Sequence, residues 1–324
     1  MTEPKSLLAQ LEKEISSTSF GESPAELYDP ITYILANGGK RLRPLLALLT
    51  YQVYQSDPTK IIKPALALEI FHNFTLMHDD IMDKAPLRRG KSTVHEKWNE
   101  NVAILSGDVM FVKAYDFLLS VAPRILPNVI KRFNECAIGV CEGQQIDMNF
   151  EQQESVREED YLDMIRKKTA VLIGFSLELG AILAEAPEKD QELWRAFGEK
   201  IGVGFQLKDD WLDVYADSDK FGKQVGGDIA ANKKTYLLIK ALEKAKGEDQ
   251  AVLKNWLNKE SFDHDAKVTA VMEIYEKLGI KTLASKKMNL FFNSAFADLE
   301  QLSIANEAVE LLKSFSHNLI NREK

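Results

Sequence analysis

Apolar residues recur along this chain at intervals of three and four positions, which is the period of an amphipathic helix, and residues 249–258 are one clear example. Two stretches, residues 71–82 and 196–215, are apolar on most faces, which indicates helices buried on several sides. No run alternates apolar and polar residues as a half-buried strand would, and no Asn-Gly or Asp-Gly pair predicts a hairpin. The pattern therefore predicts an all-α fold.

Proline and glycine positions refine this prediction. All ten prolines lie at or before Pro187, so residues 188–324 are best read as helices joined by short loops. Near the N-terminus we expect a short helix with Asp29 as its N-cap and Pro30 as its first residue, ended by Gly38, with Pro44 opening the next helix. No Ser/Gly/Pro-rich linker divides the chain, which predicts one large layered helical domain over residues 1–324.

The composition limits the classes of partner. The chain has 324 residues, with 41 Lys plus Arg against 49 Asp plus Glu, and its net charge of −8 argues against binding nucleic acid. Its two cysteines, Cys136 and Cys141, form neither a disulfide framework nor a zinc-site spacing, which favours a reducing compartment. We find no signal-peptide pattern and no membrane span, so we expect a cytoplasmic protein.

One short pattern occurs twice. Residues 75–84 read TLMHDDIMDK and residues 205–214 read FQLKDDWLDV, so each places Asp-Asp-x-x-Asp at the end of an apolar helical run. The first and last aspartates of each motif lie one helical turn apart on the same face, where like charges repel. A hard divalent cation turns that repulsion into a binding site, and few carboxylates per site suit Mg²⁺. The predicted ligands of several Mg²⁺ ions are Asp79, Asp80, Asp83, Asp209, Asp210 and Asp213.

Basic segments alternate with these acidic motifs along the chain. One copy of the acidic motif alone is equally compatible with a solvated helix end, but two copies interleaved with cations predict a pocket for a diphosphate held by Mg²⁺. His72 lies seven residues before Asp79, on roughly the same helix face, and we expect it to contact substrate. The basic segments are residues 38–44, 88–90, 167–169, 222–223 and 233–234.

Taken together, these motifs resemble those of the trans-isoprenyl diphosphate synthases, the polyprenyl synthetase family. The resemblance covers about residues 38–236. It rests on GGKRLRP at 38–44, HNFTLMHDDIMD at 72–83, LRRG at 87–90, GQQID at 143–147, KTA at 168–170, FQLKDDWLD at 205–213 and GKQVGGDIAANK at 222–233.

The resemblance implies a helical bundle of the isoprenoid synthase type, in which the two aspartate motifs face each other across a central cavity, and a homodimer. The six aspartates and Lys168 would be the catalytic residues. Lys40, Arg43, His72 and Arg89 would bind isopentenyl diphosphate; Arg88, Lys168, Lys223 and Lys233 would bind the allylic diphosphate; Gln144, Asp147, Thr169 and Gln206 would line the reacting centre. Arg322 and Lys324 resemble a basic tail that closes over the site in some members of the family.

The expected reaction couples two diphosphate substrates. Departure of diphosphate from a dimethylallyl, geranyl or farnesyl substrate would leave an allylic carbocation, which the double bond of isopentenyl diphosphate attacks. Phe74 lies five residues before Asp79, about 7.5 Å along a helix, so Phe71, Phe74 and Thr75 are the residues predicted to limit product length. This pattern resembles geranylgeranyl (C20) diphosphate synthases, with farnesyl (C15) diphosphate as the main competing product and a longer polyprenyl product as a further alternative.

Three other functions remain open at this point. His78-Asp79 is similar to the metal-binding pair of all-α phosphohydrolases, although those enzymes need further histidine ligands. A class I terpene cyclase would share one aspartate motif but would lack the second motif and the Lys40–Arg43 segment. A non-catalytic prenyl-diphosphate-binding subunit would be favoured by a degraded aspartate motif, whereas both motifs are intact.

Overall fold

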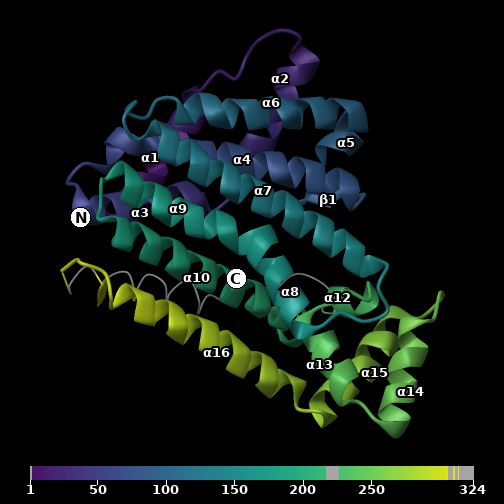
Figure 1. The fold of residues 1–324 in the computed structure, drawn as a ribbon. Coiled ribbons are helices and arrows are strands. Elements are labelled where there is room, and N and C mark those ends of the chain that lie inside the picture. Colours follow the sequence, from purple (N-terminus) through teal and green to yellow (C-terminus); the bar gives the residue numbers. More distant parts are fainter. Residues whose placement is uncertain (1, 217–225, 306–308, 311–312, 314–324) are drawn as a thin grey trace. The chain divides into compact units, whose positions relative to one another are not determined.

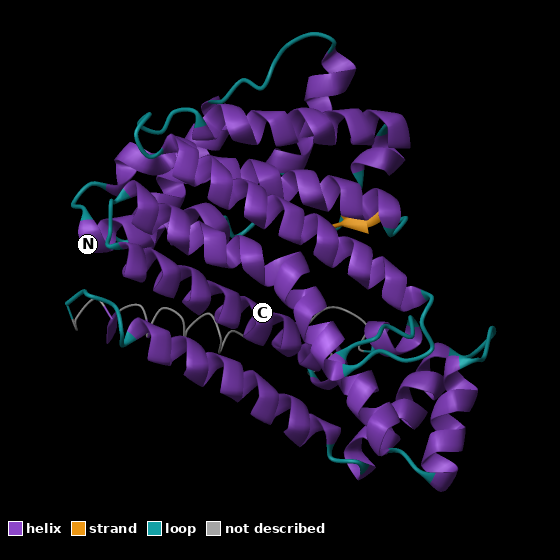
Figure 2. Cartoon of the chain, in the orientation of Figure 1, coloured by secondary structure: helices purple, strands orange, loops and turns teal. Residues whose placement is uncertain are grey.

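The computed structural model describes residues 2–216, 226–305, 309–310 and 313. The described chain is almost entirely helical (Figures 1 and 2), which confirms the predicted all-α class. Its internal contacts divide it into two compact units: unit 1 comprises Met1–Glu135 and Phe175–Arg195, and unit 2 comprises Cys136–Gly174 and Ala196–Lys324. That the whole chain forms one domain stays a prediction.

The helices of unit 1 come mainly from the first half of the chain. They are α1 (Pro4–Ser17), α2 (Ala25–Ala36), α3 (Leu42–Tyr54), the short η1 (Pro58–Ile61), α4 (Ile62–Met82), α5 (Val94–Lys97) and α6 (Glu100–Leu118), with parts of α7 (Leu126–Glu151), α9 (Val171–Leu183) and α10 (Glu188–Tyr215). Helix α4 packs most extensively against α6 and next against α3. Because α4 is covered on several sides, it can be apolar nearly all round, as the sequence predicts.

Unit 2 contains the rest of α7, α9 and α10 together with the helices of the second half. These are α8 (Glu158–Ile165), the π-helical turn η2 (Arg166–Ala170), α12 (Gly227–Ala230), α13 (Tyr236–Lys244), α14 (Gly247–Leu257), α15 (His264–Lys277) and α16 (Ile280–Leu299). Their core includes Tyr161, Leu207, Leu237 and Tyr275, all at most 2% exposed. Helix α10 carries the second aspartate motif in its last two turns, so the core of this unit fixes the position of that motif.

A small β-hairpin interrupts the helices after α4 and was not predicted. Strands β1 (Leu87–Arg88) and β2 (Lys91–Ser92) pair antiparallel, and Arg89 (φ 54°) and Gly90 (φ 75°) form the two-residue turn between them. Left-handed φ at both central positions is the geometry of a type I′ turn. Asn or Asp usually occupies the first of these positions, so the search for such pairs missed a turn that begins with arginine.

The start of α2 also differs from the prediction. The helix begins at Ala25 rather than Pro30, and Asp29 lies inside it instead of capping it. Pro30 removes one backbone hydrogen bond in the second turn, and burial of Pro30 and Ile31 offsets that cost. Its predicted end is confirmed, because Asn37 is the C-cap and Gly38 follows with φ 73°. The next helix, α3, begins two residues before Pro44.

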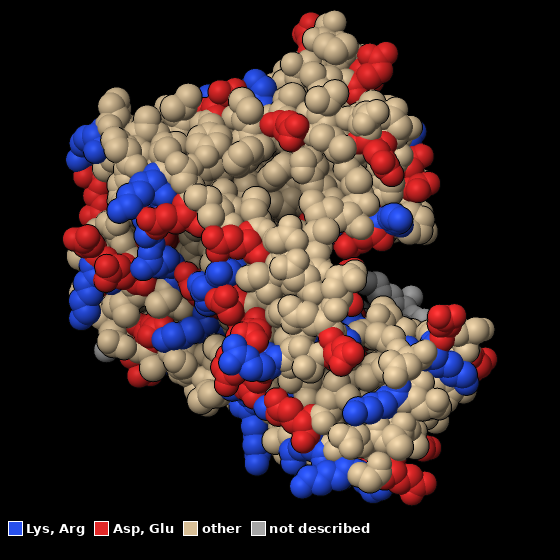
Figure 3. Space-filling model, turned by 45° about the vertical axis from the view of Figure 1, so that its right-hand side comes forward, with Lys and Arg blue, Asp and Glu red and all other residues tan. Residues whose placement is uncertain are grey.

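None of the helices within the described ranges combines the length and apolar composition that crossing a bilayer requires. On the face drawn in Figure 3, acidic and basic side chains lie next to one another, with uncharged areas between them.

Two helix glycines differ in the space around them and allow a matched stability test. A Cβ on Gly180 in α9 would lie 2.2 Å from the carbonyl oxygen of Ala47 in α3, whereas a Cβ on Gly139 in α7 would make only an ordinary 3.5 Å contact with Val171. Alanine favours a helix by about 1 kcal/mol over glycine. We expect Gly139→Ala to be neutral or stabilising in thermal unfolding, and Gly180→Ala to lose about 1–3 kcal/mol because two backbones must separate. Equal effects of the two changes would contradict this account of helix packing.

Candidate functional site

The first aspartate motif lies at the C-terminal end of α4. Asp79 and Asp80 are in its last turn and Asp83 is its C-cap. A helix C-terminus carries the negative end of the helix dipole, so three carboxylates there are electrostatically unfavourable unless cations accompany them. Asp80 is only 2% exposed, whereas Asp79 is half-buried and Asp83 is exposed. The three aspartates are therefore not equivalent.

Arg88 of the hairpin accounts for the buried position of Asp80. Its Nε lies 2.8 and 2.9 Å from the two carboxylate oxygens of Asp80, and its Nη2 lies 2.7 Å from one of them. The neighbouring Arg89 donates a hydrogen bond to the carbonyl oxygen of Gly38. The unpredicted hairpin thus brings two predicted substrate-binding arginines to the end of α4 and to the glycine turn.

Glycine is needed at position 39 of that turn. Its φ of 151° lies outside the range that side chains tolerate well, and a Cβ there would lie 3.0 Å from Nη1 of Arg89. The pair Gly38-Gly39 therefore lets the backbone approach the guanidinium closely. Lys40 follows on the exposed side of the turn, and Arg43 is half-buried in the first turn of α3.

His72 lies among these cations. Burial, together with the positive charges of Arg43, Arg89, Arg88 and Arg41, holds the pKa of His72 well below its usual range. The imidazole is therefore neutral at physiological pH and can donate one hydrogen bond. Several guanidinium groups around a neutral histidine create a strongly positive region, which is the environment that a diphosphate requires.

Sequence reasoning counts Arg41 only among the cations of residues 38–44, whereas the structure makes it the anchor of this loop. Arg41 is 3% exposed and adopts a left-handed φ of 44°. Its guanidinium lies 2.7 Å from a carboxylate oxygen of the buried Glu69 and 2.8 Å from one of Glu12, and it donates to the carbonyl oxygen of Leu35 at 2.6 Å. Because Glu69 is 28 positions away, no local spacing could have indicated this pair.

The second motif, at the end of α10, repeats this division of roles. Asp209 is exposed, Asp213 is half-buried and Asp210 is 3% exposed. Asp210 accepts hydrogen bonds from the hydroxyl of Tyr161 and, at 3.2 Å, from Nε2 of Gln206. Burial raises the pKa of Asp210 to about 7, although Lys233 and the Tyr161 hydroxyl oppose this shift.

Five further predicted residues lie together in unit 2. Lys168 donates from Nζ to Oδ2 of Asp147 at 2.6 Å, and Thr169 donates to Oε1 of Gln206 at 3.4 Å. Lys168 and Thr169 belong to η2, and π-helical turns of this kind occur frequently at functional sites. Gln144 on α7 is buried, and the adjacent Gly143 admits the backbone of Lys168, whose nitrogen would lie 2.2 Å from a Cβ at that position.

Asp228 is a site residue that sequence reasoning missed. Its backbone N–H donates to Oδ2 of Asp213 at 2.9 Å, and its carboxylate lies 3.5 Å from Nζ of Lys233. Burial raises its pKa against the opposing charge of Lys233, and Asp213 and Asp147 add to the rise. Burial lowers the pKa of Lys233, but Asp228, Asp210 and Asp147 outweigh that effect and raise it. Asp228 stands inside the motif GGDIAANK, which was the available signal.

Two of the three predicted chain-length residues, Phe71 and Phe74, belong to a cluster of aromatic side chains in unit 1. The ring of Phe74 stacks on that of Phe111 in α6, with centroids 5.1 Å apart, and Phe71 contacts Phe133 of α7 at 5.2 Å. Thr75 donates its hydroxyl to the carbonyl oxygen of His72 at 2.8 Å. Phe111 and Phe133 were not predicted, because their contacts with α4 come only from helix packing.

The expectation that the two aspartate motifs face each other stays a prediction. Lys223, Arg322 and Lys324 lie outside the described residues. His78, the residue behind the phosphohydrolase alternative, packs against α6 with its Nε2 3.2 Å from the carbonyl oxygen of Ile104.

The available donors suit magnesium. Among the residues that the structure describes, no three His, Cys, Asp or Glu side chains gather into a group that could hold a metal ion by themselves. Mg²⁺ is usually held by one or two carboxylates together with waters and substrate phosphates. Pairs of carboxylates one helical turn apart, such as Asp79 and Asp83, are a donor set of that kind.

Comparisons with known proteins bear on this arrangement. The family description "Polyprenyl synthetase" matches residues 24–275. A short chain isoprenyl diphosphate synthase of Methanocaldococcus jannaschii is 40% identical over 240 residues, covering 74% of this chain and 72% of that protein. A geranylgeranyl diphosphate synthase of Sulfolobus acidocaldarius is 36% identical over 314 residues, covering 93% of each.

Comparison of the fold with solved structures finds the same class of proteins. A crystal structure of a geranylgeranyl pyrophosphate synthase superposes with a TM-score of 0.95 at 42% identity and covers 100% of both chains. This likeness confirms the predicted isoprenoid synthase fold. The chain belongs to the polyprenyl synthetase family.

Proposed function

We propose that this enzyme condenses isopentenyl diphosphate with an allylic diphosphate and that its main product is geranylgeranyl diphosphate. The observation that carries the proposal is the acidic end of α4 surrounded by arginines, with a half-buried neutral histidine among them. Like charges gathered at a helix C-terminus are costly. A metal–diphosphate complex would neutralise both sets of charges: the metal offsets the negative carboxylates, and the diphosphate offsets the positive guanidinium groups. The names of the relatives at 36–42% identity support the same reaction.

In unit 1, Lys40, Arg43, His72 and Arg89 would bind isopentenyl diphosphate. Arginine offers paired N–H donors that match two diphosphate oxygens, and the neutral His72 adds a donor without adding repulsion to its neighbours. The ion pair of Arg41 with Glu69 would keep the glycine turn in place, so that little ordering remains to be done when the substrate binds.

The allylic diphosphate would be bound by Lys168 and Lys233, together with Lys223. Lys233 has a raised pKa and is a firmly charged partner for an anion. Gln144, Thr169 and Gln206 would line the reacting carbon atoms with amide and hydroxyl groups, which are weak nucleophiles, and the carboxylate of Asp147 is paired with Lys168. This lining suits a carbocation, which a nucleophilic side chain would trap.

We assign the Mg²⁺ ligands unequally within each motif. Asp79, Asp83, Asp209 and Asp213 would carry the metal contacts, whereas the buried Asp80 and Asp210 already have Arg88 and Tyr161 as partners. Bound Mg²⁺ would supply Lewis-acid stabilisation of the departing diphosphate. Asp80 and Asp210 would then act by fixing the helix ends.

The chemistry follows from this distribution of charge. The C–O bond of the allylic diphosphate breaks, and its electron pair leaves with the diphosphate, whose growing negative charge Lys168 and Lys233 stabilise. The double bond of isopentenyl diphosphate then attacks the allylic cation and forms the new carbon–carbon bond. Loss of a proton, by family resemblance to the released diphosphate, restores a double bond. Apolar helix faces would exclude the water that would otherwise quench the cation.

Product length would depend on the aromatic cluster as a whole. A growing prenyl chain that passes Asp79 along α4 meets Phe74 about 7.5 Å away. Phe74 is braced by Phe111, and Phe71, which is fully buried, lies one turn further along. A rigid stack of rings is a firmer stop than one side chain, and it favours the C20 product, with C15 as the competing outcome.

The predicted homodimer has a candidate surface on α6. Three apolar residues recur every seven positions along it and are 57–59% exposed: Leu105, Val112 and the C-cap Leu119. Such a stripe is the pattern that helix-to-helix packing between copies uses. We propose that a second copy of the chain covers this stripe. Light scattering of the wild type and of Leu105→Glu/Val112→Glu tests the proposal. A monomeric wild type would contradict it.

The metal assignment predicts the behaviour of a double variant. Asp79→Asn/Asp83→Asn removes two charges at nearly constant shape, and we expect kcat/KM for chain elongation to fall at least about a hundredfold. The assay incubates purified protein with Mg²⁺, isopentenyl diphosphate and farnesyl diphosphate and sizes the products by chromatography. Glu188→Gln/Glu192→Gln is the matched control, because it changes another acidic pair one turn apart in a helix. Full activity of the aspartate variant, or phosphate release without elongation by wild type, would refute the proposal.

The aromatic stop predicts a change in product size rather than in rate. Phe74→Ala and Phe111→Ala should each shift the products toward longer prenyl chains, because either change opens the stack. Phe117→Ala is the control, since Phe117 lies on the same helix α6 but stacks on Phe20 instead. Unchanged product length in both test variants would remove the cluster from this role.

A further inference from the structure

Lys267 is a fully buried lysine to which the reaction described above gives no part. It lies in α15 and is 0% exposed. Its Nζ donates to the carbonyl oxygen of Ala230 at 3.0 Å and to Oδ1 of Asn232 at 2.6 Å, and it lies 4.0 Å from the centre of the Phe262 ring. Burial lowers its pKa. Lysine is almost never fully buried unless its ammonium group has polar partners, because removing an ammonium group from water is energetically expensive.

The two acceptors belong to the segment that joins α12 to α13. Ala230 is the last residue of α12, where helix carbonyl groups lack intrahelical partners, so an ammonium there acts as a C-terminal cap. Asn232 has a left-handed φ of 54°, and its Nδ2 also donates to the carbonyl oxygen of Leu257 at 3.0 Å. Residues 230–232 are therefore tied to α15 and to the end of α14 at the same time.

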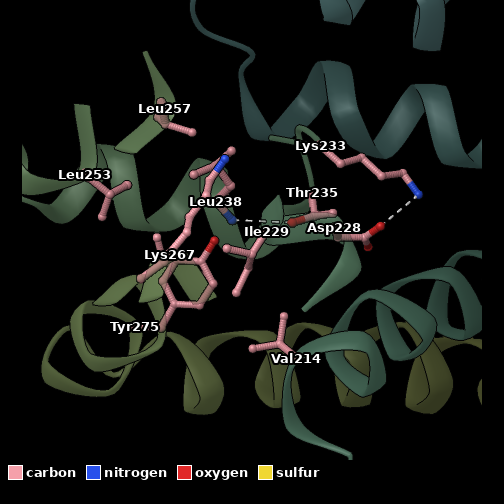
Figure 4. Close-up of a pocket in the computed structure, with 11 residues that line it drawn as sticks. Val214, Asp228, Ile229, Lys233, Thr235, Leu238, Leu253, Leu257, Lys267 and Tyr275 are labelled. Carbon is pink, nitrogen blue, oxygen red and sulfur yellow. Dashed lines mark hydrogen bonds and ion pairs between the residues drawn. The ribbon is translucent and has the colours of Figure 1, made fainter. Parts of the chain in front are cut away.

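The residue that follows this tied segment is Lys233. Its backbone N–H donates to the carbonyl oxygen of Asp228 at 2.9 Å, and its backbone carbonyl accepts from Thr235 at 2.8 Å. Figure 4 shows the side chain of Lys233 leading away from Lys267, toward the carboxylate of Asp228. A rotation of the backbone at Asn232 would displace Lys233 relative to Asp228.

Hydrophobic packing on the Lys267 side does not supply a comparable constraint. The small cavity beside Lys267 is lined by Val214, Leu253 and Tyr275 (Figure 4), and Val271 also lines it. Apolar groups like these can support a loop, but they cannot satisfy the carbonyl oxygen of Ala230 or orient the amide of Asn232. Within the described part of the chain, only the ammonium of Lys267 joins both groups.

We propose that Lys267 is a positioning residue for the allylic diphosphate: its buried ammonium fixes residues 230–232 so that Lys233 and Asp228 are already in place when the substrate binds. The inference rests on the proposed function, because it takes Lys233 as a ligand of the allylic diphosphate. Lys267 itself touches no substrate. Its contribution is to remove an ordering cost that binding would otherwise bear.

The test separates positioning from general stability. Lys267→Met keeps the length of the side chain and removes its donors, and we expect KM for farnesyl diphosphate to rise about tenfold, while KM for isopentenyl diphosphate and kcat change less than about twofold. Val271→Ala is the matched control: it weakens the same helix beside the same cavity, so thermal stability should fall and both KM values should stay unchanged. A fall in stability of Lys267→Met with both KM values unchanged would overturn the proposal.

A double-mutant cycle then identifies the path of the effect. If Lys267 acts through Lys233, Lys267→Met in a Lys233→Ala background should produce little further rise in KM for farnesyl diphosphate. Effects that multiply would show two independent roles and would contradict the proposal. Should Lys267→Met fail to fold, Asn232→Gly replaces it, because glycine keeps the left-handed backbone while removing the acceptor, and the same rise in KM is required. A wild type that forms no elongated product would instead overturn the proposed function itself.

Discussion

The accumulation of carboxylates at the C-terminal ends of two helices is the constraint on which the rest of the site depends. Asp79, Asp80 and Asp83 end α4, and Asp209, Asp210 and Asp213 lie in the last turns of α10. The helix dipole and mutual repulsion both oppose such an arrangement. The residues around each motif offset this unfavourable electrostatic energy and still leave carboxylate oxygens that a cation can reach.

Each unit meets the cost in the same manner. The middle aspartate is buried and taken up by a fixed partner, which is Arg88 for Asp80 and the hydroxyl of Tyr161 for Asp210. The outer aspartates lie nearer to solvent, and cations stand close by on other segments. Burying one carboxylate with its partner fixes the helix end, so the remaining carboxylates are held in place.

The sequence allowed prediction of those features that depend on the spacing of nearby residues. The two aspartate motifs, the apolar helices that carry them and the glycine turn at residues 38–39 follow from intervals of a few residues. The pairs Arg41–Glu69 and Phe74–Phe111, and the hydrogen bond between Asp228 and Asp213, join residues that only the packing of the chain brings together. The hairpin at residues 87–92 was missed because Arg89 occupies a left-handed turn position that asparagine usually takes.

The net charge of −8 describes the whole chain, whereas the site is defined by where individual charges lie. The central claim is that the acidic helix ends become a diphosphate site only together with Mg²⁺. Calorimetric titration of inorganic diphosphate into the full-length protein, with and without Mg²⁺, tests it most directly. The account predicts binding at least about tenfold tighter with Mg²⁺, and loss of that gain in Asp79→Asn/Asp83→Asn. Equal affinity with and without Mg²⁺ would contradict it.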